Sequence, residues 1–313
     1  MGRPLRVVSF GECMLELQGE AFGTMRQGYG GDTLNTAIYL ARCGEAHGLQ
    51  VDYATALGDD ALSGGLIERW RAEGVGVELV RRLPGRLPGL YLIEVDAHGE
   101  RRFSYWRDQA AARDYFATPP GSTPLEAGLD RIDALYLSGI SLAIVGAAGR
   151  ARLLELAARL RARGAMVAFD NNYRPRLWPE AAAAREAFDA FVDVATVALL
   201  TLDDEMALRG LSATAALAQA LALRCPEVVV KRGAESTIVR LAGTPLLQVA
   251  TEAVPRVVDT TAAGDSFAGA YLAARLAGAA PDAAAARGNR LAARVVQHRG
   301  AVIDRAAMAD LVA

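Results

Sequence analysis

The stretch Asp259–Arg275 reads DTTAAGDSFAGAYLAAR, which places small residues directly before an aspartate and a helical pattern. Small side chains let the backbone turn tightly and leave N–H groups uncovered where the helix begins. Those N–H groups and the positive end of the helix dipole favour an anion. The stretch therefore predicts an anion site beside Asp265, whose carboxylate is either a chemical group or an ordinary stabiliser of the first helical turn.

Short apolar runs alternate with helical patterns along the rest of the chain. Strands buried on both faces are predicted at residues 5–10, 134–139, 166–170, 195–200 and 227–233. Helices are predicted at residues 150–164, 179–191 and 212–224. A further helix begins near Gly264, and its core-facing stripe contains Phe267, Ala270, Tyr271 and Ala274.

This alternation predicts an α/β fold with a doubly wound, mostly parallel sheet flanked by helices, formed by one domain over residues 1–313. The helix near Gly264 then starts at the carboxyl edge of the sheet, where ligands bind in open α/β folds.

Two segments, at about residues 12–30 and 88–108, depart from the alternation. The first lacks a helical period, and the second contains a hairpin with a polar turn at residues 96–100. We interpret both as one small β-sheet lid inserted twice into the body.

The second hairpin strand has a face that matters for chemistry. Side-chain alternation places Phe103, Tyr105 and Arg107 together. Such a face suits a small polar or anionic ligand, or belongs to an ordinary solvated edge strand.

Composition excludes several classes of function. With 34 basic and 36 acidic residues and no basic cluster, the chain has no pattern for a nucleic-acid partner. Three cysteines and three histidines are too dispersed for a disulfide framework or a zinc site. The longest uncharged run, residues 134–149, is too short to span a membrane, and Glu12 and Glu16 interrupt any signal peptide. We expect a cytoplasmic protein without a membrane partner.

Familiar phosphate-loop motifs are absent from the sequence. There is no GxxxxGK[ST], and GYGGDT at residues 28–33 lacks the third glycine of GxGxxG. A dinucleotide-dependent oxidoreductase is therefore disfavoured.

Two motifs at opposite ends of the chain carry a family resemblance. DTTAAGDSFAGA (residues 259–270) resembles the C-terminal signature of the ribokinase-like (PfkB) carbohydrate kinases. GGDTLNTA (residues 30–37) resembles the N-terminal signature, with Thr33 where a small apolar residue is more usual. ALGDDALSG (residues 56–64), VVVKRGAES (228–236) and HRGA (298–301) extend the similarity over nearly the whole chain. The resemblance implies a ribokinase-like fold with a β lid and an ATP-dependent kinase activity.

Further strings resemble the members of this family that phosphorylate the terminal C6 hydroxyl of 2-keto-3-deoxygluconate. They are RLPGLYLIE (residues 86–94), FSYWR (103–107), LYLSGISLAI (135–144), DNNYRPRLW (170–178) and LTLDDE (200–205). Two alternatives stay open: a related kinase for a neutral sugar such as fructose or ribose, and a non-catalytic nucleotide or sugar sensor.

The resemblance also implies roles for individual residues. Asp265 would take the proton of the acceptor hydroxyl, and the backbone N–H groups of Ala262, Ala263, Gly264 and Asp265 would form the anion hole. The residues assigned to the substrate are Gly30, Gly31, Asp32, Asn35, Tyr91, Tyr105, Arg107 and Arg174. Arg107 is matched to the substrate carboxylate, because a guanidinium can donate two parallel hydrogen bonds to it. A structural ion pair is the alternative role for each arginine.

The implied cofactors are ATP and Mg²⁺, with K⁺ in some relatives. The residues assigned to ATP are Asn172, Lys231, Gly233, Gly264 and Asn289. Mg²⁺ would bind through the ATP phosphates, with Asp203 and Glu205 ordering its waters. The family's Asn-x-x-Glu motif has Leu202 in place of Asn, so the choice among Asp203, Asp204 and Glu205 is open. The potassium site of some relatives resembles Asp259 and Thr261.

The expected partners are a small sugar acid, ATP and further copies of this chain. A lid with open strand edges and an apolar face favours a homo-oligomer, a dimer or larger, in which lids cover each other.

Overall fold

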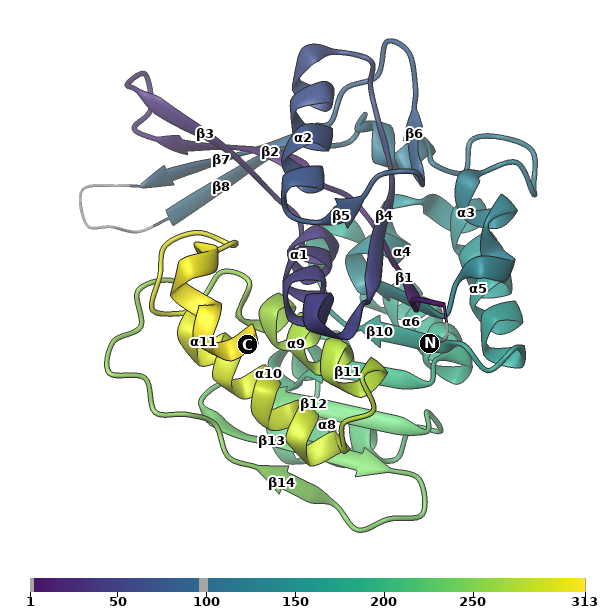
Figure 1. The fold of residues 1–313 in the computed structure, drawn as a ribbon, viewed down its shortest axis with the longest axis vertical. Helices are drawn as coiled ribbons and strands as arrows, with labels where there is room; N and C mark the ends of the chain where they lie inside the picture. The colour runs from purple at the N-terminus through teal and green to yellow at the C-terminus, as the bar shows by residue number, and fades with distance from the viewer. Residues whose placement is uncertain (1–2, 96–100, 313) are drawn as a thin grey trace.

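The computed structural model describes residues 3–95 and 101–312. It contains a large central sheet and a small separate sheet that projects from it (Figure 1). The strands of the central sheet are β1 (Arg6–Phe10), β4 (Gln50–Leu57), β5 (Val75–Gly76), β6 (Val80–Arg82), β9 (Ala134–Ser138), β10 (Met166–Asp170), β11 (Val197–Thr201), β12 (Glu227–Arg232), β13 (Glu235–Leu241) and β14 (Leu247–Val249).

The strand order is β14-β13-β12-β11-β10-β9-β1-β4-β5, with β6 also paired to β4. Only the pairs of β13 with β12 and with β14 are antiparallel among these strands. The predicted doubly wound, mostly parallel sheet is therefore confirmed. Its order reverses at β1, which runs between β4 and β9.

Helices cover both faces of this sheet (Figure 1). Those of eight or more residues are α1 (Asp32–Gly44), α2 (Ala61–Ala72), α5 (Gly146–Ala162), α6 (Ala181–Val194), α7 (Leu202–Arg209), α8 (Ala213–Leu221), α9 (Ala263–Leu276) and α10 (Pro281–Val295). The shorter ones are α3 (Pro124–Ala127), α4 (Gly139–Ile144) and α11 (Ala309–Val312). Within the described residues, no helix is both long and apolar enough to cross a bilayer.

Alternation along the strands divides the apolar core into two layers. Val8 and Phe10 of β1 belong to the layer under α5, α6 and α8, whereas Val7 belongs to the layer under α1, α2, α9 and α10. Strands that bury side chains on both faces read as continuous apolar runs, which is why the sequence identified β1, β9, β10, β11 and β12 within one or two residues.

Sequence reasoning missed five strands of the central sheet, β4, β5, β6, β13 and β14, and of these β4 lies beside β1 in the middle of the sheet. β4 reads QVDYATAL, and its aspartate breaks the apolar run. Asp52 is buried, and its carboxylate accepts a hydrogen bond from Arg6 Nε at 2.6 Å. The ion pair compensates the charge, so a strand forms where the local pattern is ambiguous.

The predicted helix near Gly264 begins at Ala263. Its expected stripe of Phe267, Ala270, Tyr271 and Ala274 is buried, but so is every residue from 266 to 274. α9 packs against α1 on one side and α10 on the other, which explains burial all round. The small residues of this helix allow that close packing: a Cβ on Gly269 would lie 2.9 Å from the backbone nitrogen of Leu40 in α1.

The projecting sheet is the predicted lid. Its strands are β2 (Met14–Gly19), β3 (Met25–Gly30), β7 (Gly89–Val95) and β8 (Arg101–Trp106), in the order β3-β2-β7-β8. β2/β3 and β7/β8 are antiparallel, so both predicted strand pairs are present. The expected turn at residues 96–100 lies outside the described residues. The rings of Tyr91 and Tyr105 stack at 6.0 Å, and those of Phe103 and Tyr105 at 6.3 Å, which confirms the shared face of Phe103 and Tyr105.

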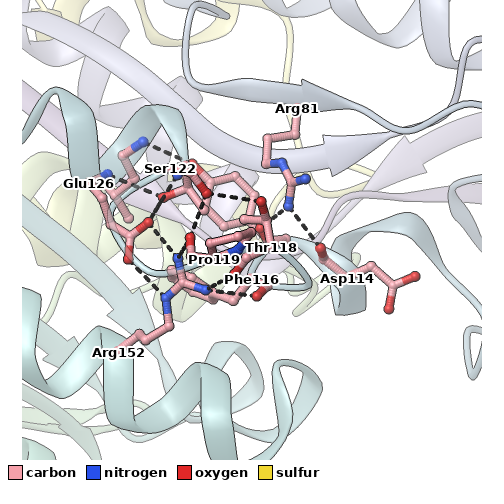
Figure 2. Close-up of polar contacts among 11 residues, drawn as sticks. Arg81, Asp114, Phe116, Thr118, Pro119, Ser122, Glu126 and Arg152 are labelled. Atoms are coloured by element: carbon pink, nitrogen blue, oxygen red, sulfur yellow. Dashed lines mark hydrogen bonds and ion pairs between the residues drawn. The ribbon is translucent and has the colours of Figure 1, made fainter.

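The chain that returns from the lid to β9 is held to α5 by one arginine (Figure 2). Arg152 donates to the carbonyl oxygens of Phe116 at 2.8 Å and Thr118 at 2.7 Å. It also pairs with Glu126, with Nε–Oε1 at 2.8 Å and Nη2–Oε2 at 2.5 Å. Arg81 of β6 donates hydrogen bonds to the backbone carbonyl oxygens of Asp114 and Tyr115, in the same returning segment. These contacts fix a segment that has little regular structure of its own.

Candidate active site

Three of the predicted residues, Asp32, Lys231 and Asp265, gather with Asp170 at the carboxyl edge of the central sheet, around the first turns of α1 and α9. Asp170 ends β10, Lys231 lies near the end of β12, and Asp32 and Asp265 lie in the first turns of α1 and α9. Parallel strands bring their carboxyl ends to one edge, so four charged side chains from distant parts of the sequence become neighbours.

The start of α9 has an unusual backbone. Ala262 has φ 60°, in the left-handed region that an L side chain rarely adopts. The preceding turn is fixed by Asp259, whose carboxylate accepts the Thr261 N–H at 3.0 Å, the Thr261 hydroxyl at 2.7 Å and the Gly300 N–H at 2.9 Å. Strain supported by surrounding bonds is typical of ligand sites.

The first-turn N–H groups differ in availability. Ala263 donates to the Thr260 carbonyl at 3.2 Å, and the helical ladder starts with Ser266 donating to Ala262 at 2.8 Å. The N–H groups of Gly264 and Asp265 lie between these two bonds, at the end of the helix that carries positive partial charge. They are the donors best placed to hold an anion.

Asp265 lies beside these donors and is half-buried. Its Oδ2 accepts a hydrogen bond from Asn35 Nδ2 of α1 at 2.8 Å. Burial, and after it the nearby charge of Asp32, raises the pKa of Asp265 to about 7, while the Asn35 hydrogen bond opposes the rise. A carboxylate with that pKa can accept a proton near neutral pH and hold it, as a general base must.

A second carboxylate faces the same space from α1. Asp32 Oδ2 accepts from Asn172 Nδ2 at 2.8 Å, and burial raises the pKa of Asp32. Asn172 has φ 24°, so two of the three non-glycine residues with positive φ in the described chain, Asn172 and Ala262, lie at this site. Gly31 precedes Asp32, and a Cβ there would lie 2.2 Å from the Glu12 carbonyl oxygen. Only glycine permits this approach.

Lys231 supplies a positive charge at the site. Its ammonium pairs with Asp170 at 2.6 Å, and both side chains are buried. A Cβ on Gly264 would lie 3.4 Å from Lys231 Nζ, so the ammonium is next to the start of α9. Gly233, two residues on, lies in an exposed turn with φ 62°. The Lys231 ammonium and the first-turn N–H groups of α9 together fit the phosphates of a nucleotide.

The three acidic residues after β11 have different surroundings. Asp203 is exposed, and Glu205 is buried and accepts from Asn171 Nδ2 at 3.1 Å and Arg209 Nε at 2.9 Å. Asp204 accepts from Arg174 at 3.3 Å, and burial raises its pKa. Of the three, Asp204 is the one that contacts a predicted site residue, Arg174. Among residues 3–95 and 101–312, no group of three or more potential metal-ligating side chains is assembled.

The lid contributes aromatic and charged groups. Tyr91 donates its hydroxyl hydrogen to Glu16, and a Cβ on Gly30 would lie 2.7 Å from that hydroxyl oxygen. The guanidinium of Arg176, from the loop after β10, lies 4.4 Å from the ring centroid of Tyr105, so body and lid are in contact here. Arg107 is buried and forms an ion pair with Glu12.

Asn289 of α10, which was assigned to ATP, is hydrogen-bonded within the protein. Its Oδ1 accepts from the Thr237 hydroxyl at 2.7 Å, and its Nδ2 donates to the carbonyls of Val249 and Ala250 at 3.3 and 3.0 Å. The side chain is buried. In this structure it anchors the end of β14 to α10.

Sequence reasoning missed three acidic residues of this region, Glu12, Glu16 and Asp170, and left Asp204 open among three candidates. Asp170 had a usable signal, because it ends a predicted buried strand at the ligand-binding edge. Asp204 is one of three adjacent acids, which spacing does not distinguish. Glu12 and Glu16 depend on contacts with residues more than seventy positions away.

Comparison with known proteins gives consistent matches. The model of the family described as pfkB family carbohydrate kinase matches residues 5–307. A 2-dehydro-3-deoxygluconokinase of Dickeya dadantii is 46% identical over 305 residues, covering 96% of this chain and 98% of that protein. Two solved structures have TM-scores of 0.80 and 24% identity: a 2-dehydro-3-deoxygluconokinase of Thermotoga maritima, covering 96% of this chain and 95% of that one, and a Xylella fastidiosa fructokinase with bound ATP, covering 98% of each.

Proposed function

This chain belongs to the pfkB family of carbohydrate kinases, and from that premise we propose that it transfers the γ-phosphoryl group of ATP to the C6 hydroxyl of 2-keto-3-deoxygluconate. The observation that carries the proposal is the Asp265 carboxylate beside the bare start of α9. Identity of 46% with a kinase of that name, over nearly the full length of both chains, supports the choice of substrate.

Asp265 acts as the general base in this proposal. Its pKa of about 7 suits the removal of a proton from an alcohol as the new phosphate ester forms. Asn35 holds the carboxylate through its hydrogen bond of 2.8 Å. The proton therefore passes from the C6 hydroxyl to a group that is already oriented.

The charge that develops on the migrating phosphoryl group is met by the N–H groups of Gly264 and Asp265 and by the Lys231 ammonium. Ala262 and Ala263 shape this hole through the left-handed turn, rather than supplying all of its donors. Preorganised donors of this kind contribute several kcal/mol to transition-state stabilisation. Lys231, already paired with Asp170, adds positive charge without needing to move.

The proposal includes Mg²⁺ and assigns Asp204 to the waters around it. Magnesium bound to ATP neutralises phosphate charge and keeps most of its own waters. Asp204, already beside Arg174, is better placed for that role than Asp203 or Glu205. Asp259 and Thr261, which set the turn before α9, are assigned to a K⁺ site; activity that is equal in sodium and potassium buffers would argue against it.

The remaining assignments divide between body and lid. Gly30, Gly31, Asp32 and Asn35 would hold the sugar hydroxyls from the start of α1, with Tyr91, Tyr105 and Arg174 closing around the substrate. Asn172 and Gly233 would adjoin the nucleotide. Because ATP is the donor, we place the reaction in the cytoplasm.

A neutral sugar remains the second candidate substrate, and one observation favours it. Arg107 forms an ion pair with Glu12, and if the role of that pair is purely structural, the site needs no anionic substrate. ADP release should be compared for 2-keto-3-deoxygluconate, fructose and ribose. The proposal predicts turnover with the keto acid at concentrations where the neutral sugars give little; faster turnover of fructose would reverse the assignment.

Arg107 itself offers a sharper test. In the proposal its guanidinium binds the substrate carboxylate, so Arg107→Ala should raise KM for the keto acid at least about tenfold. Any residual fructose activity should change little, because fructose has no carboxylate. Steady-state kinetics on both sugars measures the contrast, and equal losses on both would remove Arg107 from carboxylate recognition.

We also propose that the chain forms a homo-oligomer through its lids. β3 and β8 are the outer strands of the lid sheet as far as the chain is described, and Trp106 is 58% exposed on the face opposite Tyr105. Open edges and an exposed aromatic side chain favour association with a second lid.

A further inference from the structure

Glu12 and Arg107 connect the chain that enters the lid to the chain that leaves it. Glu12 follows β1 and precedes β2, whereas Arg107 directly follows β8. Arg107 Nη2 donates to Glu12 Oε2. Gly89, which begins β7, completes the junction: a Cβ there would lie 2.8 Å from Glu12 Oε1 and 3.3 Å from Arg107 Cβ. The pair therefore lies where three lid strands meet the body.

This ion pair is almost fully shielded from water. The Glu12 side chain is 1% exposed and that of Arg107 8%. Bringing both charges out of water is costly, and a pair of apolar side chains is often as stable or more so. Stability alone is therefore a weak reason for a buried ion pair at this position.

The hydrogen bonding of the pair is incomplete. Glu12 Oε1 and Arg107 Nε are both buried and have no hydrogen-bond partner. A guanidinium has five N–H donors, and Glu12 Oε2 accepts one of them. A buried donor without an acceptor costs free energy, and a ligand carboxylate that accepts from it recovers that cost.

The surroundings of Glu12 place the pair next to the proposed substrate site. Besides Arg107, the charges of Arg113 and Asp32 act on the Glu12 carboxylate, and Asp32 lies in the first turn of α1 at the site. Burial raises the pKa of Glu12, and Arg107 opposes the rise. Glu12 also adjoins the site through its backbone, because a Cβ on Gly31, the residue before Asp32, would lie 2.2 Å from the Glu12 carbonyl oxygen.

We propose that Glu12 is a positioning residue for substrate recognition: it fixes Arg107 so that the remaining N–H donors of its guanidinium, Nε–H among them, meet the carboxylate of the sugar acid. The inference rests on the proposed function and deepens it. Arg107 is then shared by two carboxylates, one from the protein and one from the substrate. A neutral sugar gains nothing from this arrangement, so Glu12 contributes to selectivity for the acid.

Glu12→Gln tests this role, because glutamine keeps the size of the side chain and loses the charge that holds the guanidinium. KM for 2-keto-3-deoxygluconate should rise about tenfold or more, while KM for ATP and kcat at saturating keto acid stay within about twofold. Glu12→Asp keeps the charge but is one methylene shorter, and it should give an intermediate KM. If Glu12→Gln does not fold, Glu12→Asp is the variant on which the prediction is judged.

Two controls separate positioning from plain structural support. Glu73→Gln breaks the ion pair of the half-buried Glu73 with the buried Arg42, whose atoms lie 2.9 Å apart, and should lower the unfolding temperature without raising KM for the keto acid. In an Arg107→Ala background, Glu12→Gln should cause no further rise in KM, because Glu12 acts only through Arg107. The proposal is overturned if Glu12→Gln raises KM for the keto acid just as much in the Arg107→Ala background. It is also overturned if Glu12→Gln raises KM for ATP as much as KM for the keto acid. A wild-type protein that does not phosphorylate the keto acid would instead contradict the proposed function.

Discussion

At the scale of single residues, the site combines an acid with groups that raise and lower its pKa. Asp265 is destabilised as an anion by burial and by Asp32, and stabilised by Asn35. The balance leaves its pKa at about 7. The protein therefore keeps a half-buried carboxylate, whose charged form is costly, at the position where a base is needed, which is typical of functional sites.

This balance predicts a pH dependence with a definite sign. The base must be deprotonated, so kcat/KM should fall about tenfold per unit as pH decreases below the pKa of about 7. Asn35→Ala removes a hydrogen bond that favours the charged form, so the acid limb should move to higher pH. A pH–rate profile of both proteins measures this; an unchanged limb, or one displaced to lower pH, would contradict the role of Asn35.

Some of these residues were accessible from sequence and others were not. Asp265, Asn35 and Lys231 lie in motifs or at strand ends, so their place at the sheet edge follows from local pattern. Arg107 was predicted on the lid, but its pairing with Glu12 depends on the way two lid insertions meet the body. A contact between residues 95 positions apart leaves no trace in local spacing.

At the scale of elements, most strands buried on both faces were predictable, with β4 as an exception, and the irregular segments were not. The segment between β8 and β9 has only short helical turns, and Arg152 of α5 holds it through contacts with carbonyl groups and Glu126 (Figure 2). Helical periodicity in α5 identifies the helix, but it does not identify a side chain that satisfies the backbone of another segment.

The Arg152 contacts predict a stability effect. Arg152→Ala removes the donor to several carbonyl oxygens and the charged donor to Glu126, which keeps only its bonds from Thr123, and should lower the free energy of unfolding by roughly 3 kcal/mol. Arg159→Ala, an exposed position on the same helix, is the matched control and should have little effect. Urea denaturation measures both; equal midpoints for the two variants would show that the cluster contributes little.

The Glu126 carboxylate of this cluster makes a contribution to stability that should depend on pH. Hydrogen bonds from Arg152 and Thr123 outweigh the cost of burial and lower the pKa of Glu126 from its usual 4.5 to about 2. A carboxyl group whose pKa is lower in the folded state stabilises the fold at pH values above its pKa in the unfolded state. This stabilisation is lost as the pH falls from about 4.5 to 2. The stability difference between wild type and Glu126→Gln should therefore narrow over that range.

At the scale of the whole molecule, the protein consists of a central sheet, with the candidate active site at its carboxyl edge, and a projecting lid sheet of four strands (Figure 1). The alternation of strands and helices and the two-part origin of the lid were predictable from the sequence. Packing had to supply the rest: α9 is enclosed by neighbours from both ends of the chain, and β4 is stabilised by an ion pair within its own sheet.

The lid also predicts an assembly. If lids pair through their outer face, Trp106→Ser should weaken the oligomer, since it removes an exposed aromatic side chain from that face. Light scattering across a dilution series should give the mass of a dimer or larger for wild type and a shift toward 33.1 kDa for the variant. A wild-type protein that is monomeric at every concentration would exclude the assembly.

The catalytic role of Asp265 is tested most directly by turnover and binding of Asp265→Asn. The amide keeps the shape of the side chain but cannot act as the base, so kcat should fall at least about 100-fold. The dissociation constants for ATP and 2-keto-3-deoxygluconate, measured by calorimetry, should stay close to those of wild type. A variant that binds both ligands and turns over at the wild-type rate would contradict the assignment of Asp265 as the base.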